Sequence, residues 1–275
     1  MRRWVSGIAL VTAGALLAGS AYAQGTGFAY TPGIQKYKLT TRVHREQFMG
    51  GGRAPFEFNV TTTQFVTVNI QPQAADTMRL RITLDSVNVA SKFQGPPPNV
   101  HQFDGKTLEG LISPQGRIYE FAPPAGDTSS EVLGLYRAFR SFLVALPAKP
   151  VRVGESWVDT TTVHEVKNGF DVTTRAITTS RVAGDSTVNG VKVWRVARHT
   201  DILQKGGSSL GGSPTRLEGE GTVNGVHLVS MDGVYVGSSS LQHSDITMKN
   251  AISESAPIVQ TIRSTVERVG SGSGV

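Results

Sequence analysis

Apolar and polar residues alternate along most of this chain, which is the pattern of β-strands that bury one face. The alternation runs through residues 36–44, 58–70 and 78–89, and it returns after residue 156 in seven stretches, the last of which ends at Val269. Within the third stretch the apolar positions shift phase by one residue between Leu84 and Val87. An extra residue in one strand produces such a shift, so the pattern predicts a β-bulge there.

Short turn sequences separate these stretches and predict antiparallel hairpins. Ser113-Pro114-Gln115-Gly116 lies between strands predicted at 106–112 and 117–121. Four more turns of this kind follow in the second half: Lys167-Asn168-Gly169, Asn189-Gly190, Asn224-Gly225 and Met231-Asp232-Gly233. Parallel strands would need crossovers of a dozen or more residues. The chain is therefore predicted to form an antiparallel meander.

One segment departs from the alternation and has helical spacing instead. Its large apolar residues recur at steps of three and four: Val132, Leu135, Tyr136, Phe139, Phe142, Leu143 and Leu146. Asp127 can cap the start of a helix. Pro147 ends it, because the proline ring removes a backbone donor and disfavours helical dihedrals in the preceding residue. We expect an amphipathic helix at about 127–146 whose apolar face is covered by other parts of the chain.

Together these patterns predict an α+β fold that is mostly β. The expected architecture is a long curved antiparallel meander, an open half-barrel, packed on the one helix at about 127–146. Residues 36–269 would form this single β-rich domain, residues 24–35 an extended leader, and residues 270–275 a disordered tail.

The N-terminus has the features of a secretory signal peptide. Arg2 and Arg3 precede an apolar run, and Ala21-Tyr22-Ala23 has the small residues that a signal peptidase accepts. We expect residues 1–23 to be removed after Ala23, which leaves a periplasmic or secreted protein without a transmembrane segment. The alternative is an uncleaved anchor, but the apolar run is shorter than the roughly 20 residues of a membrane-spanning helix.

Composition excludes several classes of function. The chain has no cysteine, which rules out a lipoprotein anchor, zinc–thiolate sites and a cysteine nucleophile. Loss of Arg2 and Arg3 with the signal lowers the formal net charge from +6 to +4, and the basic residues form no run. A nucleic-acid partner is therefore not expected.

Three patterns resemble catalytic motifs without their usual context. Gly207-Ser208-Ser209-Leu210-Gly211 matches the nucleophile elbow of serine hydrolases, but no helix follows it, so a flexible loop is the simpler interpretation. Glu218 and Glu220 share a strand face, as carboxylate pairs in glycosidases can, but the flanking glycines and the nearby Arg216 favour a solvated rim. The six histidines have no metal-binding helical spacing. We predict no catalytic residue, no metal and no cofactor.

One set of apolar residues is a candidate ligand site. The set is Leu135, Tyr136, Phe139, Phe142, Leu143, Trp157 and Trp194. Its members either form only the core, or line an apolar cavity left where helix and curved sheet do not close completely.

Two motifs carry a resemblance to a known family. Residues 146–157 read Leu-Pro-Ala-Lys-Pro-Val-Arg-Val-Gly-Glu-Ser-Trp, and residues 110–116 form a Gly-Leu-Ile-Ser-Pro-Gln-Gly hairpin. In these the chain resembles a family of uncharacterised secreted bacterial proteins that carry the motif Leu-Pro-x-x-Pro-Val-x-Val-Gly-x-x-Trp. The layout is similar to the half-barrels of periplasmic lipoprotein and lipid carriers. The resemblance implies no catalytic residues.

Three hypotheses for function follow. The first is a non-enzymatic periplasmic or secreted protein that binds a lipid or other apolar small molecule between helix and sheet. The second is a structural domain without a ligand that meets another envelope protein. The third is a serine hydrolase.

Overall fold

The computed structural model describes residues 28–48, 54–74, 76–91, 100–122, 139, 142–167, 170–208, 214–250 and 256–269. The predicted signal peptide at 1–23, the start of the predicted leader and the tail at 270–275 lie outside these residues. Within them, no helix is long and apolar enough to cross a membrane.

The described residues form an all-β fold with a single antiparallel sheet of eleven strands. In chain order the strands are β1 (Gly33–Gln47), β2 (Phe56–Ala74), β3 (Thr77–Ser91), β4 (Thr107–Ile112), β5 (Ile118–Ala122), β6 (Ser156–Lys167), β7 (Phe170–Val188), β8 (Val191–Ser208), β9 (Thr215–Ser230), β10 (Tyr235–Asn250) and β11 (Ala256–Val269). The only other described element is a 3-10 turn, η1 (His101–Phe103).

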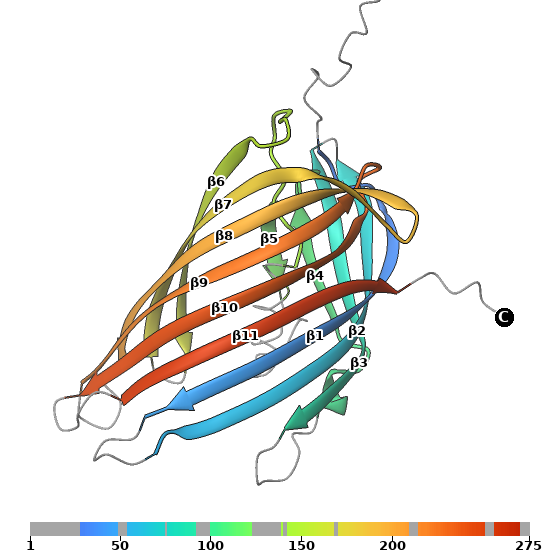
Figure 1. Cartoon of the computed structure of the whole chain (residues 1–275). Coiled ribbons are helices and arrows are strands. Elements are labelled where there is room, and N and C mark those ends of the chain that lie inside the picture. The colour runs from blue at the N-terminus through green and yellow to red at the C-terminus, as the bar shows by residue number, and fades with distance from the viewer. Residues whose placement is uncertain are drawn as a thin grey trace, which may run out of the picture.

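The sheet is a meander whose first and last strands meet in its interior. Its spatial order is β5-β4-β3-β2-β1-β11-β10-β9-β8-β7-β6, so β1 pairs with β11, and β5 and β6 are the end strands. Figure 1 shows these strands side by side in a strongly bent sheet. The antiparallel pairing predicted from the turn sequences is confirmed.

The predicted α+β class and half-barrel on a helix are wrong. Of the predicted helix at 127–146, residues 127–138, 140 and 141 lie outside the described part. Phe139 has a helical backbone, but the described residues 142–146 have no helical structure. Leu146 donates its N–H to the carbonyl of Gln115 at 2.8 Å. This hydrogen bond joins residues far apart in the sequence, whereas in a helix the acceptor would be four residues earlier in the chain. Phe142, Leu143 and Val144 are all buried, and a one-sided surface helix does not bury three consecutive residues.

The core lies on one face of the sheet, towards one end of the strands. On β2 and β3 the alternating residues that face it are fully or almost fully buried: Val66, Val68, Ile70, Leu80, Ile82 and Leu84. The residues between them, such as Arg79 and Arg81, are exposed. The β2–β3 register shifts where Phe65 lies opposite Ser86 and Val66 opposite Leu84, which confirms the predicted bulge.

A group of buried aromatic and polar side chains closes this core. Phe142 packs edge-on against Tyr37 and Tyr235, with ring centroids 5.3 Å apart in both pairs. Tyr37 donates its hydroxyl hydrogen to the carbonyl of Tyr235 at 2.8 Å. The buried His227 lies with Nδ1 3.2 Å from the hydroxyl of Tyr235. Burial and, secondly, the positive charge of Arg198 lower the pKa of His227 to about 3.

His227 is expected to make the fold sensitive to acid. Its pKa in an unfolded chain is about 6.5, so the unfolded state binds the additional proton as the pH falls from 6.5 towards 3. The stability that the neutral histidine contributes is complete above pH 6.5 and is lost below it. Between pH 7 and 4.5, wild type should lose about 2 to 3 kcal/mol more stability than His227→Gln in urea denaturation. His101→Gln, at an exposed site, is the control and should behave like wild type; equal acid losses in all three proteins would refute this.

Candidate functional site: an arginine groove on the open face

The face of the sheet opposite the core, here called the open face, carries a hollow. Strand register places one row of open-face residues across six strands: Arg42, Arg263, Leu241, Asn224, His199 and Thr179. The next row consists of Thr40, Thr265, Ser239, Val226, Ala197, Arg181 and Ser156. All of these residues except Thr40 line a hollow of about 830 Å³, which we call the arginine groove.

Two arginines lie directly opposite each other at one side of the groove. Arg42 on β1 is the register partner of Arg263 on β11, and both side chains are exposed. Like charges in directly opposed positions destabilise a sheet. The same two arginines also line a smaller hollow of about 400 Å³ over β1, β2, β3 and β11, which we call the side hollow. A ligand can therefore reach the pair from both sides.

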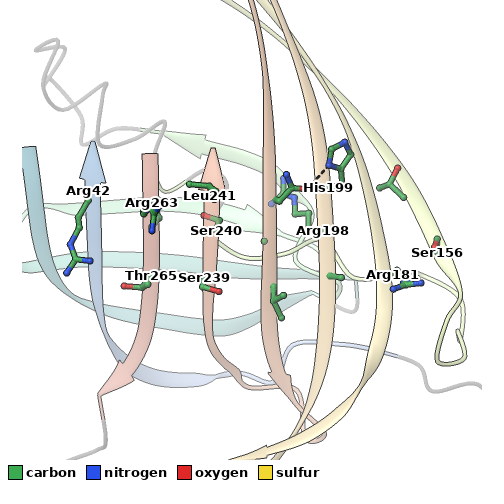
Figure 2. Close-up of a pocket in the computed structure, with 16 residues that line it drawn as sticks. Arg42, Ser156, Arg181, Arg198, His199, Ser239, Ser240, Leu241, Arg263 and Thr265 are labelled. Carbon is green, nitrogen blue, oxygen red and sulfur yellow. Dashed lines mark hydrogen bonds between the residues drawn. The ribbon is translucent and has the colours of Figure 1, made fainter. Parts of the chain in front are cut away.

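A third arginine stands at the far side of the groove. Arg181 on β7 neighbours Ser156, and Figure 2 shows these two residues across the groove from Arg42 and Arg263. From β11 to β7 there are four strand steps of about 4.8 Å, or roughly 19 Å along the sheet. The groove thus has positive charge at both of its ends and is long enough to hold an extended molecule.

No carboxylate neutralises these arginines within the groove. Neither of the two rows contains an aspartate or glutamate on strands β6 to β11 and β1. The ion pairs formed within the described part of the chain include none to Arg42, Arg181 or Arg263. The groove therefore has a net positive charge that is not balanced locally.

Two histidines on this face are each bonded to a carboxylate, Asp201 or Glu46. His199 lies in the groove, where Asn224 and then Asp201 favour its protonated form and raise its pKa. His44, in the side hollow, has a raised pKa because its ring bonds Asn59 at 2.9 Å and Glu46 at 3.1 Å. Both rings are more protonated near neutral pH than an ordinary histidine.

The predicted ligand residues lie elsewhere, on the core side of the sheet. Phe139, Phe142 and Leu143 are buried within the core, and Trp157 and Trp194 are half-buried against it. Leu135 and Tyr136 lie outside the described residues. The indole of Trp157 donates to the carbonyl of Ala145 at 3.1 Å, and Trp194 meets Phe28 edge-on at 5.7 Å. The structure gives these side chains a packing role, and their contact with a ligand stays a prediction.

The motif-like candidates do not assemble into a catalytic site in the described residues. Ser209 lies outside them. Glu218 is paired with Arg216 at 2.7 Å on the same strand, in agreement with a solvated rim. No group of three or more histidine, aspartate or glutamate side chains in the described part is arranged to hold a metal ion.

Comparison with known proteins gives matches only among solved structures. No known family and no curated protein matches the chain. Neisserial surface protein A aligns at 10% identity over 86% of this chain and 99% of its own, with a TM-score of 0.21. A BenF-like porin from Pseudomonas fluorescens Pf-5 aligns at 6% identity over 86% and 99%, with a TM-score of 0.24. A COG4313 outer membrane channel from Pseudomonas putida F1 aligns at 8% identity over 88% and 98%, with a TM-score of 0.21.

Three sequence-based predictions are corrected. The resemblance to the uncharacterised secreted family is not supported, because no known family matches the chain. The matched structures are a surface protein, a porin and an outer membrane channel, which is at odds with the predicted periplasmic or secreted location. The absence of helix in residues 142–146 contradicts a carrier that holds its ligand between helix and sheet.

Proposed function

We propose that the protein is a non-enzymatic binding protein that holds an anionic ligand in the arginine groove. The observation that carries the proposal is the opposed pair Arg42 and Arg263, which no carboxylate of the two groove rows offsets. An anion between the two guanidinium groups would relieve their repulsion and accept charge-assisted hydrogen bonds from both. The proposal concerns this surface and does not depend on the compartment in which the protein works.

Arg181 and His199 favour an elongated ligand over a single small ion. They lie on β7 and β8, several strands away from the arginine pair, and the hollow is continuous between the two sides. The residues between them are small or apolar, with Ser239, Val226 and Ala197 in successive strands. A molecule lying across the strands would thus contact cationic groups at its ends and these short side chains along its middle.

Removal of the arginine pair is expected to weaken anion binding about tenfold. The probe is sucrose octasulfate, whose sulfate charges stay constant between pH 5 and 9, with affinity measured by isothermal titration calorimetry at low salt. The double variant Arg42→Gln/Arg263→Gln loses two partly solvated charge contacts, together worth about 1 to 2 kcal/mol. Added salt should weaken wild-type binding, because exposed charges are screened.

The matched control removes two arginines from the same sheet outside the groove. Arg79→Gln/Arg216→Gln has the same net charge as the test variant and should bind within twofold of wild type. Equal weakening in both double variants would show non-specific attraction to a basic protein, and absence of binding to wild type would refute the proposal outright.

A further inference from the structure

A second hollow on the open face adjoins the arginine groove. It has a volume of about 860 Å³ and lies over β8, β9, β10 and β11. Val226, Ser239 and Thr265 line both hollows, so the two are continuous. Thr265 is two residues from Arg263 along β11, which is about 7 Å in an extended strand. The arginine pair therefore stands at the entrance to this second hollow.

Aliphatic side chains form one part of the lining of the second hollow, and the charged residues Arg195, Glu267 and Arg268 also line it. Its apolar residues are all half-buried and come from five strands, β7 to β11: Val188, Val191, Val226, Leu228, Val236 and Val266. Val236 takes part because of a β-bulge: Tyr235 lies opposite Val229 and Gly237 opposite Leu228, which leaves Val236 without a register partner. Its side chain then joins Leu228 on the hollow. The bulge thus enlarges the aliphatic part of this hollow.

From this arrangement we infer that the ligand is an anionic amphiphile, a single molecule with one sulfate, phosphate or carboxylate head and an alkyl or aryl arm. The head lies between Arg42 and Arg263, and the arm passes Thr265 and Ser239 into the aliphatic hollow. The inference rests on the proposed function, because it places the head at the same arginine pair. This site is on the opposite side of the sheet from the core and from the aromatic residues singled out in the sequence.

Charge and burial both favour this class of occupant over a purely polar anion. A polar anion would satisfy the arginines but leave Val226, Leu228 and Val236 in contact with water. An aliphatic arm removes apolar surface from water, which is favourable in proportion to the area covered. Because the hollow is open on one side, each methylene should gain about half of the roughly fourfold increase in affinity that complete burial gives.

The test is the dependence of affinity on chain length. Methyl, butyl, hexyl, octyl and decyl sulfate would be titrated below their micelle concentrations. We expect about a twofold gain in affinity per methylene, or about 60-fold from butyl to decyl. Leu228→Thr/Val236→Thr, at two positions that line the second hollow and not the arginine groove, should remove most of this gain and leave the binding of sucrose octasulfate within twofold of wild type. Leu203→Thr, at an exposed position on β8 outside the hollow, should change neither.

The outcomes separate this inference from the proposed function. Equal affinities for all chain lengths, with sucrose octasulfate still bound through Arg42 and Arg263, would refute the amphiphile and leave the anion site standing. A chain-length gain that survives in Leu228→Thr/Val236→Thr would place the arm elsewhere and also overturn the inference. Sedimentation with anionic phospholipid vesicles, without binding of dispersed alkyl sulfates, would assign a membrane surface in place of a single molecule.

Discussion

Phe142→Ala is expected to destabilise the protein by about 3 to 5 kcal/mol. The Phe142 ring is 5% exposed and packs against Tyr37, Tyr235 and Phe139, with centroids 5.3, 5.3 and 6.1 Å away. Alanine would leave a cavity among rings that are held by their own hydrogen bonds and cannot easily collapse into it. The free energy of unfolding would be measured by urea titration followed by tryptophan fluorescence.

The matched control for this substitution is Phe65→Ala. Phe65 lies on the open face of β2 and is 41% exposed, so its removal creates no buried cavity. A loss below about 1 kcal/mol is expected there. Similar losses in the two variants would mean that the 142–146 segment does not pack as described.

Gly233→Ala is expected to cost about 2 to 5 kcal/mol. Gly233 has a φ of 86°, where a side chain is unfavourable, and it follows directly on the turn after β9. A Cβ at this position would also overlap the carbonyl oxygen of Ala29 and approach Thr31 Oγ1 to 2.7 Å. Thr31 donates its N–H to the carbonyl of Gly233 at 3.0 Å, so the N-terminal segment would be displaced from the sheet.

Gly190→Ala separates the cost of a side chain at positive φ from the cost of its contact with neighbouring atoms. Gly190 has a similar φ of 79°, but no heavy atom lies within 4 Å of a Cβ built there. It should therefore lose only the backbone term, about 1 to 2 kcal/mol. Thermal unfolding of both variants would measure the difference, and a loss at Gly190 as large as that at Gly233 would show that contact with Ala29 and Thr31 is not the cause.

Local sequence signals predicted the local parts of the fold. The turn at Asn189-Gly190 is confirmed, with both residues at positive φ, and so is the turn between β4 and β5. Asn224-Gly225 was wrongly predicted as a hairpin, because it lies within β9. Asn224 bonds His199 at 2.8 Å, and a Cβ on Gly225 would meet Ser239 at 3.0 Å. Gly225 thus allows β9 and β10 to approach closely. An Asn-Gly sequence occurs in such a strand as well as in a turn, so the sequence alone does not show which of the two is present.

The helix was predicted wrongly and the site was missed, both for non-local reasons. The apolar residues of 142–146 are buried from several sides by strands distant in sequence, and an apolar run buried in this way can imitate helical spacing. The arginine groove depends on register: Arg42, Arg181 and Arg263 are far apart in the chain and meet on one face only through the strand order. Alternation along a single strand does not show which arginines become neighbours on the sheet.

The central pairing of β1 with β11 has a consequence for biosynthesis. Lys36 lies opposite Val269, so the strand made first finds one of its two partners only when the last strand has emerged from the ribosome. Until then β1 and β10 each expose a row of unpaired backbone groups to other nascent chains. Contacts this distant in sequence also slow the final closure of the sheet. A chain truncated before residue 256 would keep most of its core residues. It would nevertheless expose the unpaired edges of β1 and β10, which are prone to aggregation, in place of one continuous sheet.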